Sequence, residues 1–191
     1  MTKHLTTNAP ATDIPVPGIP FLRLKTGSAA KLGARSQGAV AYEVLTDLER
    51  RQIHLRLTAN SGGGNHSLEA VPFATVQSIV NGLEAGAPFA SRVFRGAFRG
   101  GSQNNPGFLA CLLRTEGLLA AAEGKAFQHV VSGDWSAWAD ALLTQPGEAV
   151  ELPLKLAQAA LPADTAAPSL PGRRGRRKSR VEEADDACAA H

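Results

Sequence analysis

Two neighbouring runs in which hydrophobic and polar residues alternate constrain the fold of this chain more than any other feature. The first is GAVAYEVLTD (38–47) and the second is QIHLRLTA (52–59). A period of two residues is typical of a β-strand with one buried face. Only the polar turn LERR (48–51) separates the runs, so they predict an antiparallel pair of strands.

Three further segments are expected to be strands, and the second run assigns faces to its side chains. In that run the apolar residues are expected to face inward. His54 is expected to face outward, as exposed strand histidines commonly do, where it would border the loop that follows. IPFLRLK (19–25) predicts a first edge strand, AFQHVV (126–131) a short strand and EAVELPL (148–154) the last strand.

Three segments with apolar residues at helical spacing predict helices. The first is VPFATVQSIVNGLE (71–84), and the second is NPGFLACLLRTEGLLAAA (105–122). The third is SGDWSAWADALL (132–143), with Ser132 or Asp134 near its cap. Together with the strands they predict a mixed α/β or α+β fold, with a small antiparallel or mixed sheet and three to four helices.

Composition divides the chain into one domain and two tails. Since 43% of the residues are hydrophobic, segment 18–154 is expected to bury one core. Residues 1–17 are small, polar and rich in proline and are expected to be disordered. Residues 155–191 carry seven Lys/Arg and five Asp/Glu, which predicts a disordered charged tail or a non-specific arm for a phosphate backbone.

The sequence also argues against several classes of protein. It holds no stretch of about 18 apolar residues, so no membrane span is expected. Its first residues lack the apolar segment of a secretory signal. Cys111 and Cys188 are far apart, which fits neither a disulfide framework nor a CxxC metal site. A cytoplasmic protein is expected, and its net charge of +3 points only weakly to nucleic acid.

The stretch NSGGGNHSLEA (60–70) lies between the second alternating run and the first predicted helix. Gly62, Gly63 and Gly64 allow positive φ angles and a close approach of the backbone to a phosphate. If the loop leads directly into the helix, unpaired amide groups and the helix dipole favour an anion there. The stretch matches neither the Walker A spacing nor the GxGxxG fingerprint, and a loose loop that merely caps the helix explains it equally well.

The side chains that follow the glycines suit phosphate chemistry. His66 can donate a hydrogen bond or act as a general acid or base. Glu69, expected in the first helical turn, can act as a base, complete a cap or hold a divalent metal with substrate phosphates. His66 and Glu69 are therefore the candidate catalytic residues. The candidate phosphate-binding residues are Gly62, Gly63, Gly64, Asn65 and Ser67, of which Asn65 and Ser67 are alternatively helix caps.

A second cluster, RVFRGAFRGGSQNNPG (92–107), combines arginines, glycines and aromatic residues. Arginine forks bind phosphates, and interleaved phenylalanines can stack on bases. Phe94 and Phe98 are equally explained as core residues with the arginines on the exposed face. Asn105 is expected to cap the next helix, whose start offers a second anion site. The candidate binding residues of this cluster are Arg95, Arg99, Ser102 and Asn104, with Arg92 beside them.

Four other reactive or aromatic residues are expected to be structural. His129 lies in a short predicted strand, and Cys111 lies in a leucine-rich helix, where a buried inert thiol is expected. Trp135 and Trp138 form a stripe on one helical face and are expected in the core. No HxxxH or HExxH pair occurs, so no stable zinc site is expected.

The order of a strand, GGGNHSLEA and a helix resembles the glycine turn of the ParB/sulfiredoxin fold, in which the turn and adjacent polar residues bind nucleotide phosphates. Asn65 and Ser67 stand where sulfiredoxins have the reactive cysteine and its arginine, so sulfiredoxin chemistry is not expected. The wider run from AYEVLTD through GGSQNNPGFLACLLRTEGLL resembles proteins of conjugative plasmids and integrating elements. Among these is the Osa/FiwA type of fertility inhibition factor, which has the same fold.

This resemblance implies a function and a set of partners. Factors of this type block transfer of a rival plasmid and have been linked to ATPase and DNase activity. The resemblance implies ATP and Mg²⁺ as cofactors, and DNA and a conjugative coupling protein or another type IV secretion component as partners. It implies that the glycine turn contacts phosphate and that Glu69, His66, Arg95 and Arg99 are candidates for the hydrolytic chemistry.

Three functions remain open from the sequence. The first is a nuclease or ATPase that inhibits plasmid transfer. The second is a non-enzymatic DNA-binding module that contacts the backbone through Arg92, Arg95, Arg99 and the basic tail. The third is a protein–protein inhibitor that contacts a transfer machine through an apolar or tryptophan-bearing face.

Overall fold

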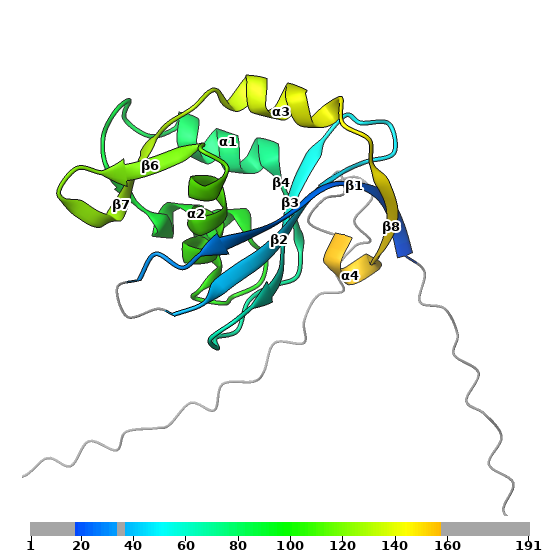
Figure 1. Cartoon of the computed structure of the whole chain (residues 1–191), viewed down its shortest axis with the longest axis horizontal. Helices are drawn as coiled ribbons and strands as arrows, with labels where there is room; N and C mark the ends of the chain where they lie inside the picture. The colour runs from blue at the N-terminus through cyan, green and yellow to red at the C-terminus, as the bar shows by residue number, and fades with distance from the viewer. Residues whose placement is uncertain (1–17, 34–36, 158–191) are drawn as a thin grey trace, which may run out of the picture.

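Residues 18–33 and 37–157, described by a computed structural model, form two antiparallel sheets and several short helices (Figure 1). The mixed α+β class predicted from the sequence is therefore confirmed. Along the chain the elements are β1 (Gly18–Ala30), β2 (Ala39–Thr46), β3 (Ile53–Asn60), β4 (Ala70–Pro72), α1 (Phe73–Asn81), β5 (Phe89–Ala90), the 3₁₀ helix η1 (Ser91–Ala97), α2 (Asn105–Thr115), β6 (Leu119–Ala122), β7 (Lys125–Val131), α3 (Trp135–Leu143), β8 (Glu148–Pro153) and α4 (Leu154–Ala157).

The larger sheet has the strand order β4-β3-β2-β1-β8. The predicted β2–β3 pair is confirmed, with Val44 opposite Leu55. The expectation that β1 is an edge strand is wrong, because β8 returns from the far end of the domain and pairs Val150 with Phe21. A register shift between Arg23 and Lys25 marks an irregularity where β1 passes from β8 to β2.

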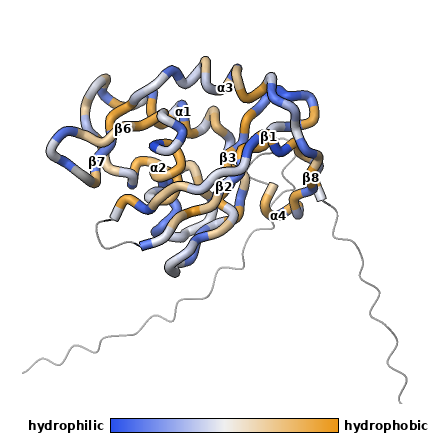
Figure 2. Tube along the Cα trace, viewed as in Figure 1, coloured by the Kyte–Doolittle hydropathy of each residue, from blue (hydrophilic) through white to orange (hydrophobic). Residues whose placement is uncertain are grey.

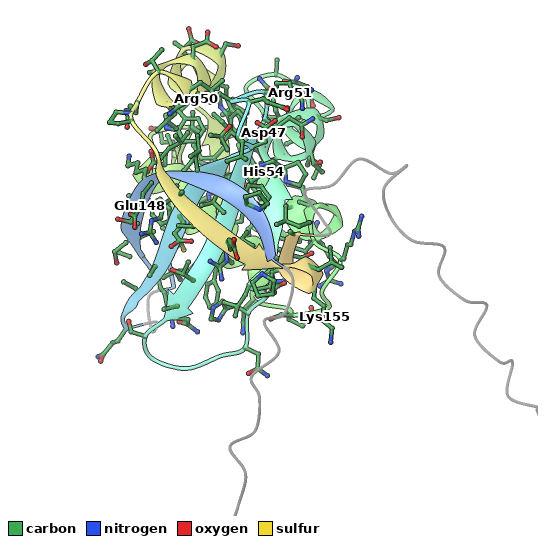
Figure 3. The ribbon with its side chains drawn as sticks, turned by 90° about the vertical axis from the view of Figure 1, so that its right-hand side faces the viewer. Asp47, Arg50, Arg51, His54, Glu148 and Lys155 are labelled. Atoms are coloured by element: carbon green, nitrogen blue, oxygen red, sulfur yellow. The ribbon has the colours of Figure 1, made fainter. Side chains whose placement is uncertain are left out.

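The outward orientation predicted for His54 is also wrong, since its side chain is only 1% exposed. At this end of the sheet, β1, β8 and α4 cover the face that the alternation assigns to solvent (Figure 3). The His54 ring packs edge-on against Phe21, with their centroids 5.4 Å apart. A strand covered on both faces buries its polar positions too, and the period of two no longer reports exposure.

The main core lies between the larger sheet and the helices. Figure 2 shows hydrophobic residues along much of α2, and Leu109, Leu112 and Leu113 of that helix are buried. Trp135 stacks on Phe73 with ring centroids 5.4 Å apart, and Trp138 packs against the same ring. The expectation that the tryptophan stripe belongs to the core is confirmed.

Two predicted helices are shorter than expected. The helix expected over 105–122 ends at Thr115, because Gly117 takes a φ of +76° and the residues after it pair with β7 as strand β6. The helix expected over 71–84 begins only at Phe73, because β4 precedes it. β1 is longer than expected and continues to Ala30, beyond the predicted end at Lys25. Asp134 caps α3, as predicted, by accepting a hydrogen bond from the Ala137 amide at 2.9 Å.

The described region ends close to the positions where the two tails were predicted to begin. α4 continues to Ala157, whose side chain is buried against the Phe21 cluster. Residues 1–17 and 158–191, which include the charged tail and Cys188, lie outside the described residues. Within the described part of the chain, no helix has the length and apolar character needed to cross a membrane.

Candidate functional site

The glycine loop joins two strands and does not lead into a helix. It follows β3, and β4 begins at Ala70 and pairs with β3 before α1 starts. The expected phosphate site at the α1 N-terminus is therefore wrong, since the helix dipole does not act on this loop. The alternative that Asn65 or Ser67 caps the helix is also wrong, because Pro72 occupies the N-cap position without a side-chain hydrogen bond.

The three glycines each have a left-handed backbone, with φ angles of +85°, +83° and +98° for Gly62, Gly63 and Gly64. The Asn60 amide donates to the carbonyl of Gly63 and, at 2.8 Å, to that of Gly64. Lys31 Nζ donates to the Gly63 carbonyl at 3.4 Å. Among the described residues, no hydrogen bond occupies the amide groups of these glycines. The carbonyls of the loop thus accept hydrogen bonds from Asn60 and Lys31, whereas the amide groups of the three glycines donate none among the described residues.

Hydrogen bonds join the glycine loop to the second cluster. The Asn65 carbonyl accepts hydrogen bonds from Ser102 Oγ at 2.6 Å and from Asn104 Nδ2 at 3.0 Å. The Ser67 amide donates to Asn105 Oδ1 at 2.9 Å. The structure therefore brings together two segments that lie about forty residues apart, but it uses their polar side chains to hold each other.

Glu69 is the centre of this junction and does not fit the role of catalytic base. Its side chain is 6% exposed. Oε1 accepts from Ser67 Oγ at 2.6 Å and from the Gly100 amide at 3.0 Å, and Oε2 accepts from the Arg99 amide at 3.1 Å. With both oxygens engaged by donors, the carboxylate is not placed to ligate Mg²⁺ or to take a proton from water. It positions the loop from Arg99 to Gly100.

His66 lies apart from the Glu69 hydrogen bonds and packs against α2. Its ring meets Phe108 edge-on, with centroids 6.4 Å apart. Its Nε2 is buried without a hydrogen-bond partner among the described residues. His66 therefore has one ring nitrogen that no hydrogen bond from the described residues occupies, whereas both side-chain oxygens of Glu69 are occupied.

The start of α2 differs by one residue from the prediction. Asn104 is the N-cap and makes no capping hydrogen bond, while Asn105, expected to cap, is fully buried. Asn105 instead accepts from the Ser67 amide and donates to the Gly100 carbonyl at 3.5 Å. Pro106 occupies the first turn, as predicted.

A cavity of about 290 Å³ lies beside this junction, and we call it the cationic cavity. The segment that follows β1, the 3₁₀ helix η1, the first turns of α2 and strand β7 form its walls. Its lining residues are Lys31, Leu32, Gly33, Ser91, Arg92, Arg95, Gln103, Asn104, Pro106, Gly107, Phe108, Cys111, Phe127 and His129. Arg95 also lines a neighbouring hollow of about 220 Å³ that includes Gly100, Gly101 and Ser102.

Three basic side chains give the cationic cavity its charge. Arg92 and Arg95 come from η1, and Lys31 follows β1. None of the three forms an ion pair with a carboxylate of the described residues. Arg95 donates to the side-chain oxygen of Gln103, and Lys31 Nζ lies 5.4 Å from the centre of the Phe108 ring. The cavity is therefore a region of uncompensated positive charge with an aromatic wall.

Sequence reasoning missed Lys31, Phe108 and Phe127 and treated His129 as structural. Phe127 and His129 both line the cavity from β7, but the pairing of β7 with β6 shifts register just before His129, so simple alternation along the strand does not reveal that they belong together. Phe127 is 61% exposed although it is a large apolar residue. Phe94 is fully buried and Phe98 packs against the core, so the core interpretation of those phenylalanines is confirmed.

His129 and Cys111 form a buried part of the cavity lining. Burial and then the positive charge of Arg114 lower the pKa of His129 to about 4, so the imidazole is neutral at pH 7. Cys111 is 3% exposed, and burial raises the pKa of its thiol. The expectation of a buried thiol is confirmed, and the raised pKa is that of a weak nucleophile.

Within residues 18–33 and 37–157, no group of three or more His, Cys, Asp or Glu side chains is arranged to hold a metal ion. No family model, curated protein or solved structure matches the chain. The site is therefore interpreted from its own geometry.

Proposed function

We propose that the chain binds the phosphates of nucleic acid or nucleotides on the face around the cationic cavity. The observation that carries this proposal is the grouping of Lys31, Arg92 and Arg95 at one cavity without carboxylate partners among the described residues. Uncompensated arginines favour anions, and their planar forks match phosphate oxygens.

The neighbouring loops support phosphate as the anion. The open amide groups of the glycine loop and the exposed Arg99 lie on segments held together by Glu69. Backbone amides in a loop with positive φ angles are a common anion-binding arrangement. Arg99 and the glycine amides therefore extend the basic surface beyond the cavity, as a backbone with many phosphates requires.

Hydrolysis is a second candidate function, and the hydrogen bonding of His66, rather than that of Glu69, is the observation that favours it. The Nε2 of His66 has no hydrogen-bond partner among the described residues, whereas both Glu69 oxygens already accept hydrogen bonds. DNase and ATPase assays with Mg²⁺ on the purified wild type, His66→Ala and Glu69→Gln test this. Activity that is abolished in His66→Ala and kept in Glu69→Gln supports hydrolysis, and equal activity in all three proteins rejects both catalytic roles.

In the cell, the proposed function is inhibition of plasmid transfer, as the resemblance to fertility inhibition factors implies. Phosphate binding would then act on transferred DNA, on ATP or at a coupling protein of the secretion machine. Expression of the chain in a donor strain should lower conjugation frequency, and the same expression of an Arg92→Ala, Arg95→Ala double variant should not. Equal transfer with and without the chain would reject this role.

The binding proposal is tested by fluorescence anisotropy with labelled DNA and with ATP as a competitor. Replacing Arg92 and Arg95 by alanine should weaken binding by at least about tenfold. The control variant removes Arg51 and Lys155, two exposed cations on the β2–β3 turn and α4, neither of which lines the cavity (Figure 3). Equal affinity of the two double variants would contradict the proposal.

A further inference from the structure

The cationic cavity contains a buried polar atom that phosphate binding leaves unused. His129 lines the cavity and is 1% exposed, and its Nδ1 has no hydrogen-bond partner among the described residues. Buried polar atoms in folded proteins are nearly always paired with protein, water or ligand. The cavity wall therefore includes a side chain whose hydrogen-bonding capacity the described residues leave unused.

The charge state of His129 indicates what kind of group that is. Its pKa of about 4, lowered by burial and by Arg114, keeps the ring neutral at physiological pH. A neutral imidazole offers one hydrogen-bond donor and one acceptor and adds no attraction for a phosphate. Its natural partner is an uncharged polar edge, such as the carbonyl, amine or ring nitrogen of a nucleobase.

The walls of the cavity suit a flat ring. Phe127 of β7 lines the cavity together with His129 and is 61% exposed, and Phe108 lines the cavity from α2. Exposed aromatic rings in a basic groove stack on the bases of single-stranded nucleic acids. A base lying on Phe127 would bury a ring that the protein alone leaves in solvent.

The size of the cavity limits the ligand to one base. Its volume of about 290 Å³ is at the lower end of the range for small-molecule sites. The basic residues Arg92 and Arg95 lie on the same cavity and would meet the phosphates on either side of that base. A base in a duplex is stacked and paired, so only an unpaired nucleotide can enter.

We propose that the cationic cavity captures one unstacked base of a single-stranded nucleic acid. In this arrangement Phe127 stacks on the base, His129 hydrogen-bonds to its edge, and Lys31, Arg92 and Arg95 hold the flanking phosphates. This inference rests on the phosphate-binding function proposed above and adds the part of the ligand that is recognised. It predicts a preference for single strands over duplexes.

The test compares three labelled probes of equal charge per strand: a single strand of about 12 nucleotides, the same strand with all bases removed, and the duplex. The full-length protein, Phe127→Ala and Val131→Ala are titrated with each. Val131 is the matched control, because it is an exposed apolar residue of the same strand that does not line the cavity. The ¹⁵N shifts of the His129 ring report the imidazole contact without a substitution in the core.

The wild type and Val131→Ala should bind the normal strand roughly tenfold more tightly than the baseless strand. Phe127→Ala should lose that difference and keep its affinity for the baseless strand. The His129 ring shifts should change with the normal strand and stay constant with the baseless one.

Equal binding of normal and baseless strands would overturn base capture while leaving phosphate binding intact. Binding to none of the probes would instead remove the proposed function itself. Tight binding of a free nucleoside monophosphate, with no gain from a strand, would overturn the choice of a single strand as the ligand.

Discussion

Positive charge is paired with carboxylates on the sheet formed by β1, β2 and β3, but in the part of the chain that the structure describes it is left unpaired at the cationic cavity. On the sheet, Arg23 and Arg56 each lie 3.0 Å from an oxygen of Glu43, and Arg23 also pairs with Glu148. At the cavity, the basic residues have no such partners among the described residues. Carboxylates therefore neutralise Arg23 and Arg56 on the sheet, whereas the cations where we place the ligand are left uncompensated by the described carboxylates.

The buried carboxylates of Glu116 and Glu69 also have hydrogen-bond donors as partners. Glu116, beyond the end of α2, accepts hydrogen bonds from Tyr42, from Lys25 at 2.7 Å and from Trp138 at 2.9 Å. Burial acts to raise its pKa, but these hydrogen bonds outweigh it and lower the pKa below its ordinary value. Glu69 is likewise saturated, by a hydroxyl and two amides. These two buried carboxylates are therefore structural, and we place the available chemistry at the cations.

The largest expected effect is the loss of the Glu116 interactions. Glu116→Ala leaves the hydroxyl of Tyr42 and the indole of Trp138 without their acceptor inside the protein, and should lower the free energy of unfolding by about 2–4 kcal/mol. Urea denaturation measures this. Affinity for DNA of the folded variant should be unchanged, and a selective loss of affinity would break the division between the two regions.

A slightly smaller loss of stability is expected when Glu69, which lies where the two regions meet, is replaced. Glu69→Ala removes a buried acceptor from the amides of Arg99 and Gly100 and should cost about 2–3 kcal/mol of stability. Glu69→Gln, which keeps one acceptor oxygen, should cost less. A stable Glu69→Ala protein that has lost all hydrolytic activity would contradict the positioning role.

Two glycine substitutions sharpen the account of the loop. Gly63→Ala and Gly64→Ala both force a side chain into a left-handed conformation, at about 1–2 kcal/mol each. At Gly63 a Cβ would meet nothing within 4 Å, but at Gly64 it would lie 2.8 Å from Asn104 Nδ2. Gly64→Ala should therefore be the more destabilising in thermal unfolding. Equal losses would show that the contact with the second cluster contributes nothing.

The smallest expected effect is the acid sensitivity caused by His129. Its folded pKa of about 4 lies below the ordinary value near 6.5, so the unfolded chain binds the proton first as pH falls. The stability due to the neutral ring is complete above pH ~6.5 and falls by roughly 1–2 kcal/mol by pH ~5. Chemical denaturation of wild type and His129→Gln at several pH values measures it, and parallel pH profiles would contradict it.

The sequence predicted most of the elements, because alternating and helical periods report packing on one face. It failed where packing is decided by distant chain segments. β8 and α4 bury His54, and β4 separates the glycine loop from α1; neither event is visible in the local pattern. The same limit hid the structural role of Glu69, whose partners Arg99 and Gly100 lie about thirty residues away.

The candidate site was predicted in part for the same reason. The arginines and the two glycine-rich segments were found because their residue types are unusual in a run. Lys31 follows β1, and Phe127 and His129 lie in β7; their local patterns look ordinary, and only the fold places them on one cavity. The absence of carboxylate partners for these cations among the described residues is a property of tertiary structure and cannot be read from net charge.

The salt dependence of single-strand affinity tests the central claim most directly. For single strands the logarithm of the affinity falls with the logarithm of salt concentration by about 0.7 per phosphate contact. Removing Arg92 and Arg95 should flatten that slope by about 1.4, whereas removing Arg51 and Lys155 should leave it unchanged. If both double variants keep the wild-type slope, the unpaired cations of the cavity do not contact phosphate, and the account is contradicted.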